Sequence, residues 1–154
     1  MNNGRMFHFG AQLSKGRQGE ELLLAHWPCK VWRHEELKGP DFIDAQDRVI
    51  ELKTDSYSLD ATPNFFIERW SSVEDKKPGG PWQAAAKGCN CFVYLYASDR
   101  RWFVFESLPH LLAELNALTP DLQPVSIRNR GWTTQGYKIP RAKLAHIYRE
   151  ERLP

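Results

Sequence analysis

Residues 40–53, which read PDFIDAQDRVIELK, decide the fold. Short apolar runs lie on either side of Gln46 and Asp47, a polar pair that suits a tight turn. The pattern predicts a hairpin with strands at residues 41–45 and 48–53. Because side chains alternate along a strand, Ile50 and Leu52 of the second strand share a face and can enter a core.

The other face of the second strand carries Val49 and two charged side chains. Glu51 and Lys53 share one face, with roughly 6.5 Å between their Cα atoms. Asp41 begins the preceding strand, so pairing of the two strands brings it toward Glu51. Two adjacent carboxylates repel unless a hard cation lies between them, and oxygen ligands suit Mg²⁺ or Mn²⁺. The alternative is an exposed hairpin whose Glu-x-Lys pattern is only solvated.

A third carboxylate lies on a predicted helix over residues 11–27. Glu20 shares a face of this helix with Leu23, Leu24 and Trp27. A carboxylate on an apolar face is costly to bury unless it is paired or bound to a metal. Glu20 therefore faces the sheet or the edge of a cleft, or it is a boundary residue that reaches solvent.

The remaining pattern alternates between strand and helix periodicity. We expect a third extended segment at residues 64–70, then a polar surface loop at 71–81. The further expected elements are a helix at 82–87, strands at 92–97 and 102–106, a helix capped by Ser107 that ends near 118, a short strand near 137–139 and a final helix after Pro140. This order predicts an α/β fold with a central mixed sheet flanked by helices.

These residues resemble the PD-(D/E)XK nuclease superfamily. The resemblance rests on Glu20 in a helix, the Pro40-Asp41 dipeptide and Glu51-Leu52-Lys53, ten residues after Asp41. It covers about residues 15–106 and implies a restriction-endonuclease-like αβββαβ core. Among its members, the chain looks most like phage and archaeal Holliday-junction resolvases, particularly the phage T7 endonuclease I type, and is also similar to phage homing endonucleases.

The resemblance implies a role for each of these residues. Asp41 and Glu51 would be the metal ligands, Glu20 an accessory ligand to the metal or its water, and Lys53 the catalytic lysine. Gln83 and Lys87, four apart on the next helix, become candidates to orient the water and to bind phosphate. The implied reaction is phosphodiester hydrolysis in DNA with Mg²⁺, for which Mn²⁺ can substitute. Glu68 shares a strand face with Phe66 and Trp70 and is a further carboxylate of open role.

The net charge of +2 is too small to indicate nucleic-acid binding by itself, but the basic residues gather in two places. One is the loop at residues 71–81, and the other is a basic C-terminal extension at 107–154. The expected DNA contacts outside the predicted helix at 82–87 are Lys76, Lys77, Arg128, Arg130 and Lys138. Trp132 and Tyr137, interleaved with these cations, suit stacking on unpaired bases or, equally, a dimer interface.

The chain has 154 residues, which predicts a single nuclease domain over residues 1–154. No apolar run reaches the length that a membrane helix needs, and no secretory signal is expected. The odd count of three cysteines argues against a disulfide scaffold and favours a reducing cytoplasm, bacterial or in a phage-infected host. Cutting both strands with one small site favours a two-fold homodimer.

The sequence therefore predicts a metal-dependent DNA endonuclease that is junction-resolving or site-selective. Two alternatives stay open. One is a DNA-binding module of the same fold without catalysis, and the other is an RNA nuclease. No HExxH or HNH-like spacing is present, so the five histidines have no predicted catalytic role.

Overall fold

Two β-sheets and three helices make up the part of the chain that the computed structural model describes, which is residues 16–27, 29–33 and 40–154. The main sheet has the strand order β1-β2-β3-β6-β7-β10, in which only the β3–β6 pairing is parallel. Its strands are β1 (Cys29–Arg33), β2 (Pro40–Asp44), β3 (Val49–Asp55), β6 (Cys91–Tyr96), β7 (Arg101–Phe105) and β10 (Arg149–Arg152).

The second sheet has the order β5-β4-β9-β8 and is antiparallel throughout. Its strands are β4 (Asn64–Ser72), β5 (Lys77–Pro78), β8 (Val125–Arg128) and β9 (Thr133–Pro140). The helices are an N-terminal helix over residues 16–26, α2 (Gly80–Ala86) and α3 (Leu108–Leu118). Short 3-10 turns lie at Leu59–Ala61, Thr119–Asp121 and Arg141–Leu144. None of the helices in the described ranges is both long and apolar enough to cross a bilayer.

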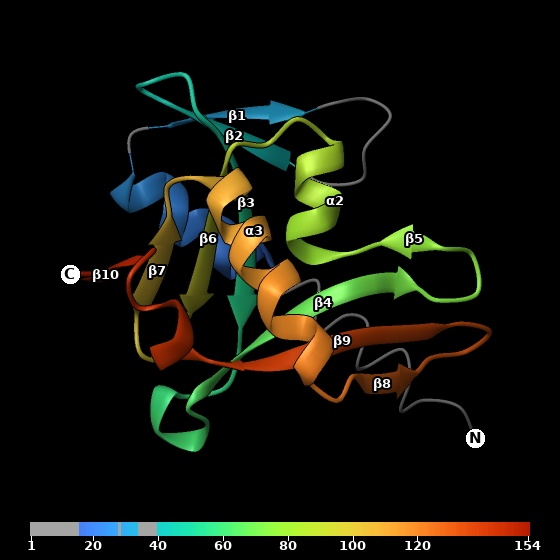
Figure 1. Cartoon of the computed structure of the whole chain (residues 1–154). Helices are drawn as coiled ribbons and strands as arrows, with labels where there is room; N and C mark the ends of the chain where they lie inside the picture. The colour runs from blue at the N-terminus through green and yellow to red at the C-terminus, as the bar shows by residue number, and fades with distance from the viewer. Residues whose placement is uncertain (1–15, 28, 34–39) are drawn as a thin grey trace, which may run out of the picture.

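Each face of the main sheet carries its own core (Figure 1). On one face, Leu23 of the N-terminal helix and Trp27, just after its end, pack with Phe42 and Ile50. On the other face, α2, α3 and the second sheet cover a larger cluster rich in aromatic rings. Strand β6 lies between the two cores, and all of its side chains are buried, which confirms the expectation from its apolar sequence. Both faces of the main sheet are therefore covered, as in other mixed α/β folds.

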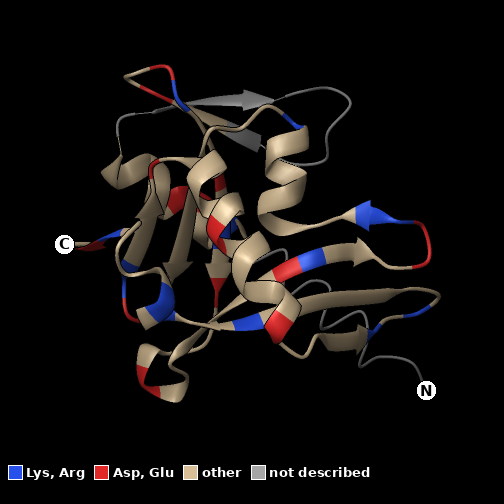
Figure 2. Cartoon of the chain, in the orientation of Figure 1, with Lys and Arg blue, Asp and Glu red and all other residues tan. Residues whose placement is uncertain are grey.

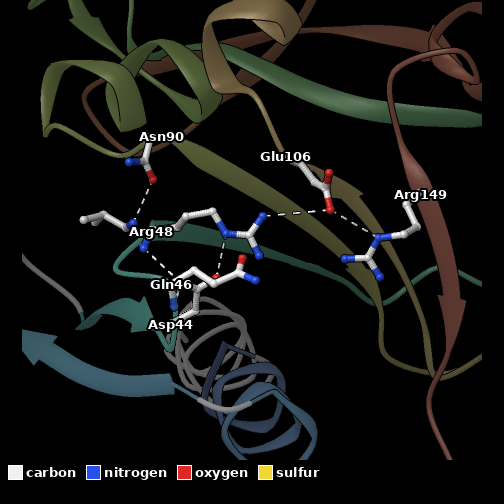
Figure 3. Close-up of polar contacts among 7 residues, drawn as sticks. Asp44, Gln46, Arg48, Asn90, Glu106 and Arg149 are labelled. Atoms are coloured by element: carbon white, nitrogen blue, oxygen red, sulfur yellow. Dashed lines mark hydrogen bonds and ion pairs between the residues drawn. The ribbon is translucent and has the colours of Figure 1, made fainter.

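The turn between β2 and β3 is fixed by the carboxylate of Asp44. This carboxylate accepts hydrogen bonds from the backbone N–H of Gln46 and of Arg48, both at 2.9 Å, and from the Arg48 guanidinium at 2.7 Å (Figure 3). The next N–H, that of Val49, donates to the side-chain oxygen of Asn90 at 2.8 Å. These contacts account for the polar backbone groups where β3 begins, so the start of β3 is well defined.

Two tyrosines of β6 join the main sheet to the second sheet. The Tyr94 hydroxyl accepts a hydrogen bond from the Phe66 N–H of β4 and donates one to the Asp55 carboxylate at the end of β3. The Tyr96 hydroxyl donates to the Asn64 carbonyl, also in β4. These bonds hold the N-terminal half of β4 against β6, and they therefore help to set where the second sheet lies relative to β3.

Several expectations about the elements need correction. The segment at residues 64–70 is a strand, as expected. It lies in the second sheet, however, and does not pair with the hairpin of residues 40–55 as a third strand of the main sheet. Its N-terminal half is held instead by the hydroxyl groups of the two tyrosines. The loop at 71–81 contains β5 and the start of α2, and the segment after Pro140 forms a 3-10 turn and β10 instead of a helix. Strands β1 and β8 were not anticipated. The coarse α/β class is correct, and the Ser107 cap is confirmed by its bond from the His110 N–H.

The cysteines within the described ranges behave as packing residues. Cys89 and Cys91 are buried, and they belong to the two different cores. Burial raises the pKa of the Cys91 thiol to about 11, so this thiol stays protonated at neutral pH.

Candidate active site

A cavity of about 960 Å³ opens beside β3, where the N-terminal helix, β3, α2 and the second sheet meet. Its described lining includes charged and polar side chains from all of these elements. They are Glu20, Glu51, Lys53, Thr54, Asp55, Asn64, Glu68, Lys87, Asn129, Thr134 and Lys138. The charged residues that the sequence pattern singled out on β3 therefore share one concave surface with residues far away along the chain.

Glu51 lies next to Lys87, the residue that ends α2. The Lys87 ammonium nitrogen is 3.4 Å from a carboxylate oxygen of Glu51, and the two side chains are 10% and 24% exposed. The sequence predicts that Lys87 binds phosphate, which stays a prediction. In the structure its ammonium group contacts Glu51, the candidate metal ligand.

Lys53 lies near Glu68, a carboxylate that comes from β4. Burial raises the pKa of Glu68, and the positive charge of Lys53 offsets part of that rise. Gly79 allows this placement, because a Cβ atom added there would come within 2.6 Å of the Glu68 side chain. The chain just before α2 thus holds Glu68 against the cavity, and the carboxylate whose role was open in the sequence is a member of the site.

Glu20 lies on the N-terminal helix, is partly buried and lines the same cavity. The helix approaches β3 closely at the preceding residue, where a Cβ added to Gly19 would overlap the side chain of Thr54. This close approach brings Glu20 to the end of β3 that carries Lys53. The expectation that Glu20 faces a cleft edge is confirmed.

The backbone of Asp41 is placed by the pairing of β2 with β3. Phe42 lies opposite Ile50 and Ile43 opposite Val49, and one further step of the same antiparallel register would set Asp41 opposite Glu51. Strand β2 itself runs from Pro40 to Asp44. The Asp41 side chain lies outside the described part of the structure, and its predicted role as a metal ligand stays a prediction.

The other predicted residues divide into two groups. Lys138 of β9 lines the cavity, whereas Lys76, Lys77, Arg128 and Arg130 are exposed at the hairpin ends of the second sheet (Figure 2). Gln83 is exposed on α2 and is not among the described residues that line the cavity. The geometry therefore gives no support to a water-orienting role for Gln83, because the helix turns this residue toward solvent.

Two site residues were missed by reasoning from the sequence. Asp55 continues the alternation of Glu51 and Lys53 along β3, and it accepts the hydrogen bond of the Tyr94 hydroxyl at 2.5 Å. The period of two along β3 could have identified Asp55. Tyr94 lies within a wholly apolar stretch, and nothing local distinguishes it from a core residue.

Across the described ranges, no group of at least three His, Cys, Asp or Glu side chains is arranged to hold a metal ion. The predicted ligand set also contains Asp41, whose side chain is outside those ranges. The donors that are described, the carboxylates of Glu51 and Glu20, are oxygen ligands of the kind that Mg²⁺ prefers. The chemistry of the donor set is thus compatible with Mg²⁺.

Comparisons of the chain with family models, with curated proteins and with solved structures find no match.

Proposed function

We propose that this protein is a metal-dependent endonuclease that hydrolyses phosphodiester bonds in DNA, with a restriction-endonuclease-like core of the PD-(D/E)XK type. The observation that carries the proposal is the arrangement on two adjacent strands. Glu51 and Lys53 line a cavity, and continuation of the β2–β3 register by one step beyond the Phe42–Ile50 pair would bring Asp41 opposite Glu51. The class of site is one in which carboxylates and an amine converge where a phosphate can bind.

Asp41 and Glu51 would hold Mg²⁺, and Glu20 would contact the ion or a water that the ion holds. Bound there, the ion would supply a water of lowered pKa and would offset the charge of the attacked phosphate. Mn²⁺ has the same preference for oxygen ligands and would substitute. Lys87 would support Glu51 in this role, because their contact at 3.4 Å orients the carboxylate.

Lys53 would contact the attacking water or a nonbridging oxygen of the phosphate. An ammonium group at this point stabilises negative charge that develops during in-line attack. Glu68, beside Lys53 and confined by Gly79, would fix the direction of the ammonium group. We assign Glu68 as a positioning residue and leave Gln83 without a role.

The cations around the cavity would bind the DNA backbone. Lys138 lines the cavity, and Lys76, Lys77, Arg128 and Arg130 are exposed further along the second sheet. Such contacts fix the position of the DNA without reading its sequence, and they weaken as salt rises. A homodimer in a bacterial or phage-infected cytoplasm would supply the second site needed to cut both strands.

The test is nicking of supercoiled plasmid in Mg²⁺, in Mn²⁺ and in EDTA. We expect nicking with either metal and none in EDTA, and we expect Asp41→Ala and Lys53→Ala to abolish it. Lys143→Ala is the matched control, because Lys143 is an exposed lysine outside the cavity lining. A panel of duplex, four-way junction, flap and single strand then separates junction resolution from site-selective cutting.

Two results would refute the proposal. DNA binding without nicking in every metal would identify a non-catalytic binding module. Cleavage of RNA of matched sequence, with the DNA left intact, would identify an RNA nuclease.

A further inference from the structure

The two hairpin ends of the second sheet are joined into one rigid surface, formed by residues 71–77 and 127–134, which we call the hairpin platform. The Glu74 carboxylate accepts hydrogen bonds from the N–H and from the hydroxyl of Thr133, both at 2.7 Å. The Val73 N–H donates to the Thr133 carbonyl at 2.9 Å, and the Thr134 hydroxyl donates to the Ser71 carbonyl at 3.2 Å. Backbone and side-chain bonds thus hold both hairpins in one fixed position.

The platform presents an aromatic ring at its end. Trp132 is 43% exposed in the turn between β8 and β9. This turn is closed by a bond of 2.8 Å from the Asn129 N–H to the Trp132 carbonyl. Two apolar neighbours on the platform, Val73 and Ile127, are also exposed, at 38% and 46%. A large ring that is exposed on a rigid turn is unusual for a residue with only a packing role.

The charge around Trp132 is mainly positive. Lys76, Lys77, Arg128 and Arg130 are all exposed on the platform. The two carboxylates there are engaged locally, since Glu74 accepts from Thr133 and Asp75 accepts from the Ser72 hydroxyl at 3.1 Å. A polyanion therefore meets four exposed cations, of which Arg128 also donates a hydrogen bond to the Thr133 hydroxyl at 3.5 Å, and two carboxylates that are already hydrogen-bonded.

The platform continues into the cavity of the candidate active site. Ile127, Asn129 and Thr134 belong both to the platform and to the lining that contains Glu51 and Lys53. Trp132 lies six residues before Lys138, which is roughly 20 Å along an extended strand. A strand of nucleic acid bound in the cavity can therefore reach the platform.

We propose that Trp132 stacks on an unpaired DNA base while the surrounding lysines and arginines bind the adjoining phosphates. The protein would then prefer DNA with an unpaired segment over a continuous duplex. Base stacking on an exposed ring requires a free base face and tolerates every base, whereas phosphate contacts are available in any DNA. The inference rests on the proposed function for its choice of DNA as substrate, but it concerns binding and not cleavage.

The experiment measures binding by fluorescence anisotropy in EDTA, so that no cleavage is needed. The probes are a continuous duplex, the same duplex with unpaired thymines at its centre, and single-stranded oligothymidine. We expect Trp132→Ala to weaken binding to both unpaired probes by about 10- to 100-fold and binding to the duplex by less than about twofold. Trp132→Phe keeps a ring and should retain most of the affinity, and melting curves should show both variants folded because Trp132 is exposed.

Three outcomes would overturn the inference. Trp132→Ala could leave all affinities unchanged, or it could weaken the three probes equally. It could also abolish self-association in sedimentation experiments while DNA binding stays the same, which would identify Trp132 as a contact between copies. Failure of the proposed function gives a different pattern from failure of this inference. Neither the wild type nor any variant would nick DNA with Mg²⁺, while Trp132→Ala would still lose binding selectively to the unpaired probes.

Discussion

Two groups of charged residues lie close together in the chain around β3, and their geometry differs. At the turn before β3, the Asp44 side chain is 2% exposed and accepts three hydrogen bonds of 2.7 to 2.9 Å from residues within four positions (Figure 3). On β3 itself, Glu51 is 24% exposed and lies 3.4 Å from Lys87, a residue 36 positions away.

The comparison separates structural charge from charge that can do chemistry. A buried carboxylate surrounded by short, local hydrogen bonds is fully used in holding a turn. Carboxylates and amines brought from four different elements to the wall of a cavity do not stabilise a turn, and they can still reach a ligand. We therefore expect substitutions in the first group to change stability and substitutions in the second to change activity.

The largest effect is expected at Glu51. Glu51→Gln keeps the size of the side chain and removes the charge that would bind the cation. We expect nicking to fall by about 1,000-fold, which corresponds to about 4 kcal/mol of activation free energy, while DNA binding at low salt stays largely intact. Single-turnover cleavage and filter binding measure the two quantities. Full activity of Glu51→Gln would show that Glu51 is not a ligand.

Asp44→Ala should change stability instead. The variant leaves the Arg48 guanidinium and two backbone N–H groups without their acceptor. We expect a loss of roughly 2–3 kcal/mol in the free energy of unfolding, since Arg48 remains partly solvated. Urea denaturation measures this loss, and Asp121→Ala, at an exposed aspartate on a 3-10 turn, is the control.

The Asp44 effect should also depend on pH. Burial acts to raise the pKa of Asp44, but the hydrogen bonds from Arg48 and Gln46 outweigh it and the net pKa is lowered. A lowered pKa means that the stabilisation is present above the unfolded value of about 3.9 and is lost as pH falls through the folded value. The stability difference between wild type and Asp44→Ala should therefore shrink below about pH 4. A difference that grows in acid would contradict this account.

Both groups show how much the sequence could predict. Period-two alternation along residues 48–53 was enough to predict that Glu51 and Lys53 share one face of the strand, because a strand fixes the face of each side chain locally. The contact of Lys87 with Glu51 and the placement of Glu68 by Gly79 depend on how α2 and β4 pack, which no local pattern encodes. The division into two sheets was missed for the same reason, since it follows from bonds between β6 and β4.

Tyr94→Phe tests the hydrogen bonds that join β6 to β4 and so position the charged residues around the cavity. The substitution removes a fully buried hydroxyl that accepts a hydrogen bond from the Phe66 N–H and donates one to the Asp55 carboxylate. We expect a loss of about 1–2 kcal/mol in the free energy of unfolding and faster hydrogen exchange at the Phe66 amide. Tyr57→Phe, at a tyrosine that is 66% exposed, should change neither quantity. Equal protection of the Phe66 amide in Tyr94→Phe and wild type would show that the hydroxyl does not hold β4.

The smallest effect is expected from Glu68→Gln and concerns the free energy of unfolding. The direction in which this effect changes with pH shows whether Glu68 behaves like the first group of charges or like the second. Burial raises the pKa of Glu68 despite the opposing charge of Lys53, so ionisation of Glu68 disfavours the folded state. Stability associated with the protonated carboxyl is present below the unfolded pKa of about 4.3 and is lost as pH rises through the higher folded value.

Wild type should therefore become less stable relative to Glu68→Gln as pH rises above about 4.3. Because such substitutions change the free energy of unfolding by less than about 1 kcal/mol, the difference in Tm should be at most a few degrees. Glu21→Gln, at an exposed glutamate of the N-terminal helix, is the control for the loss of a carboxylate. If the difference in stability between wild type and Glu68→Gln instead appears on acidification, Lys53 holds Glu68 ionised as Arg48 holds Asp44. Glu68 would then belong with the structural charges.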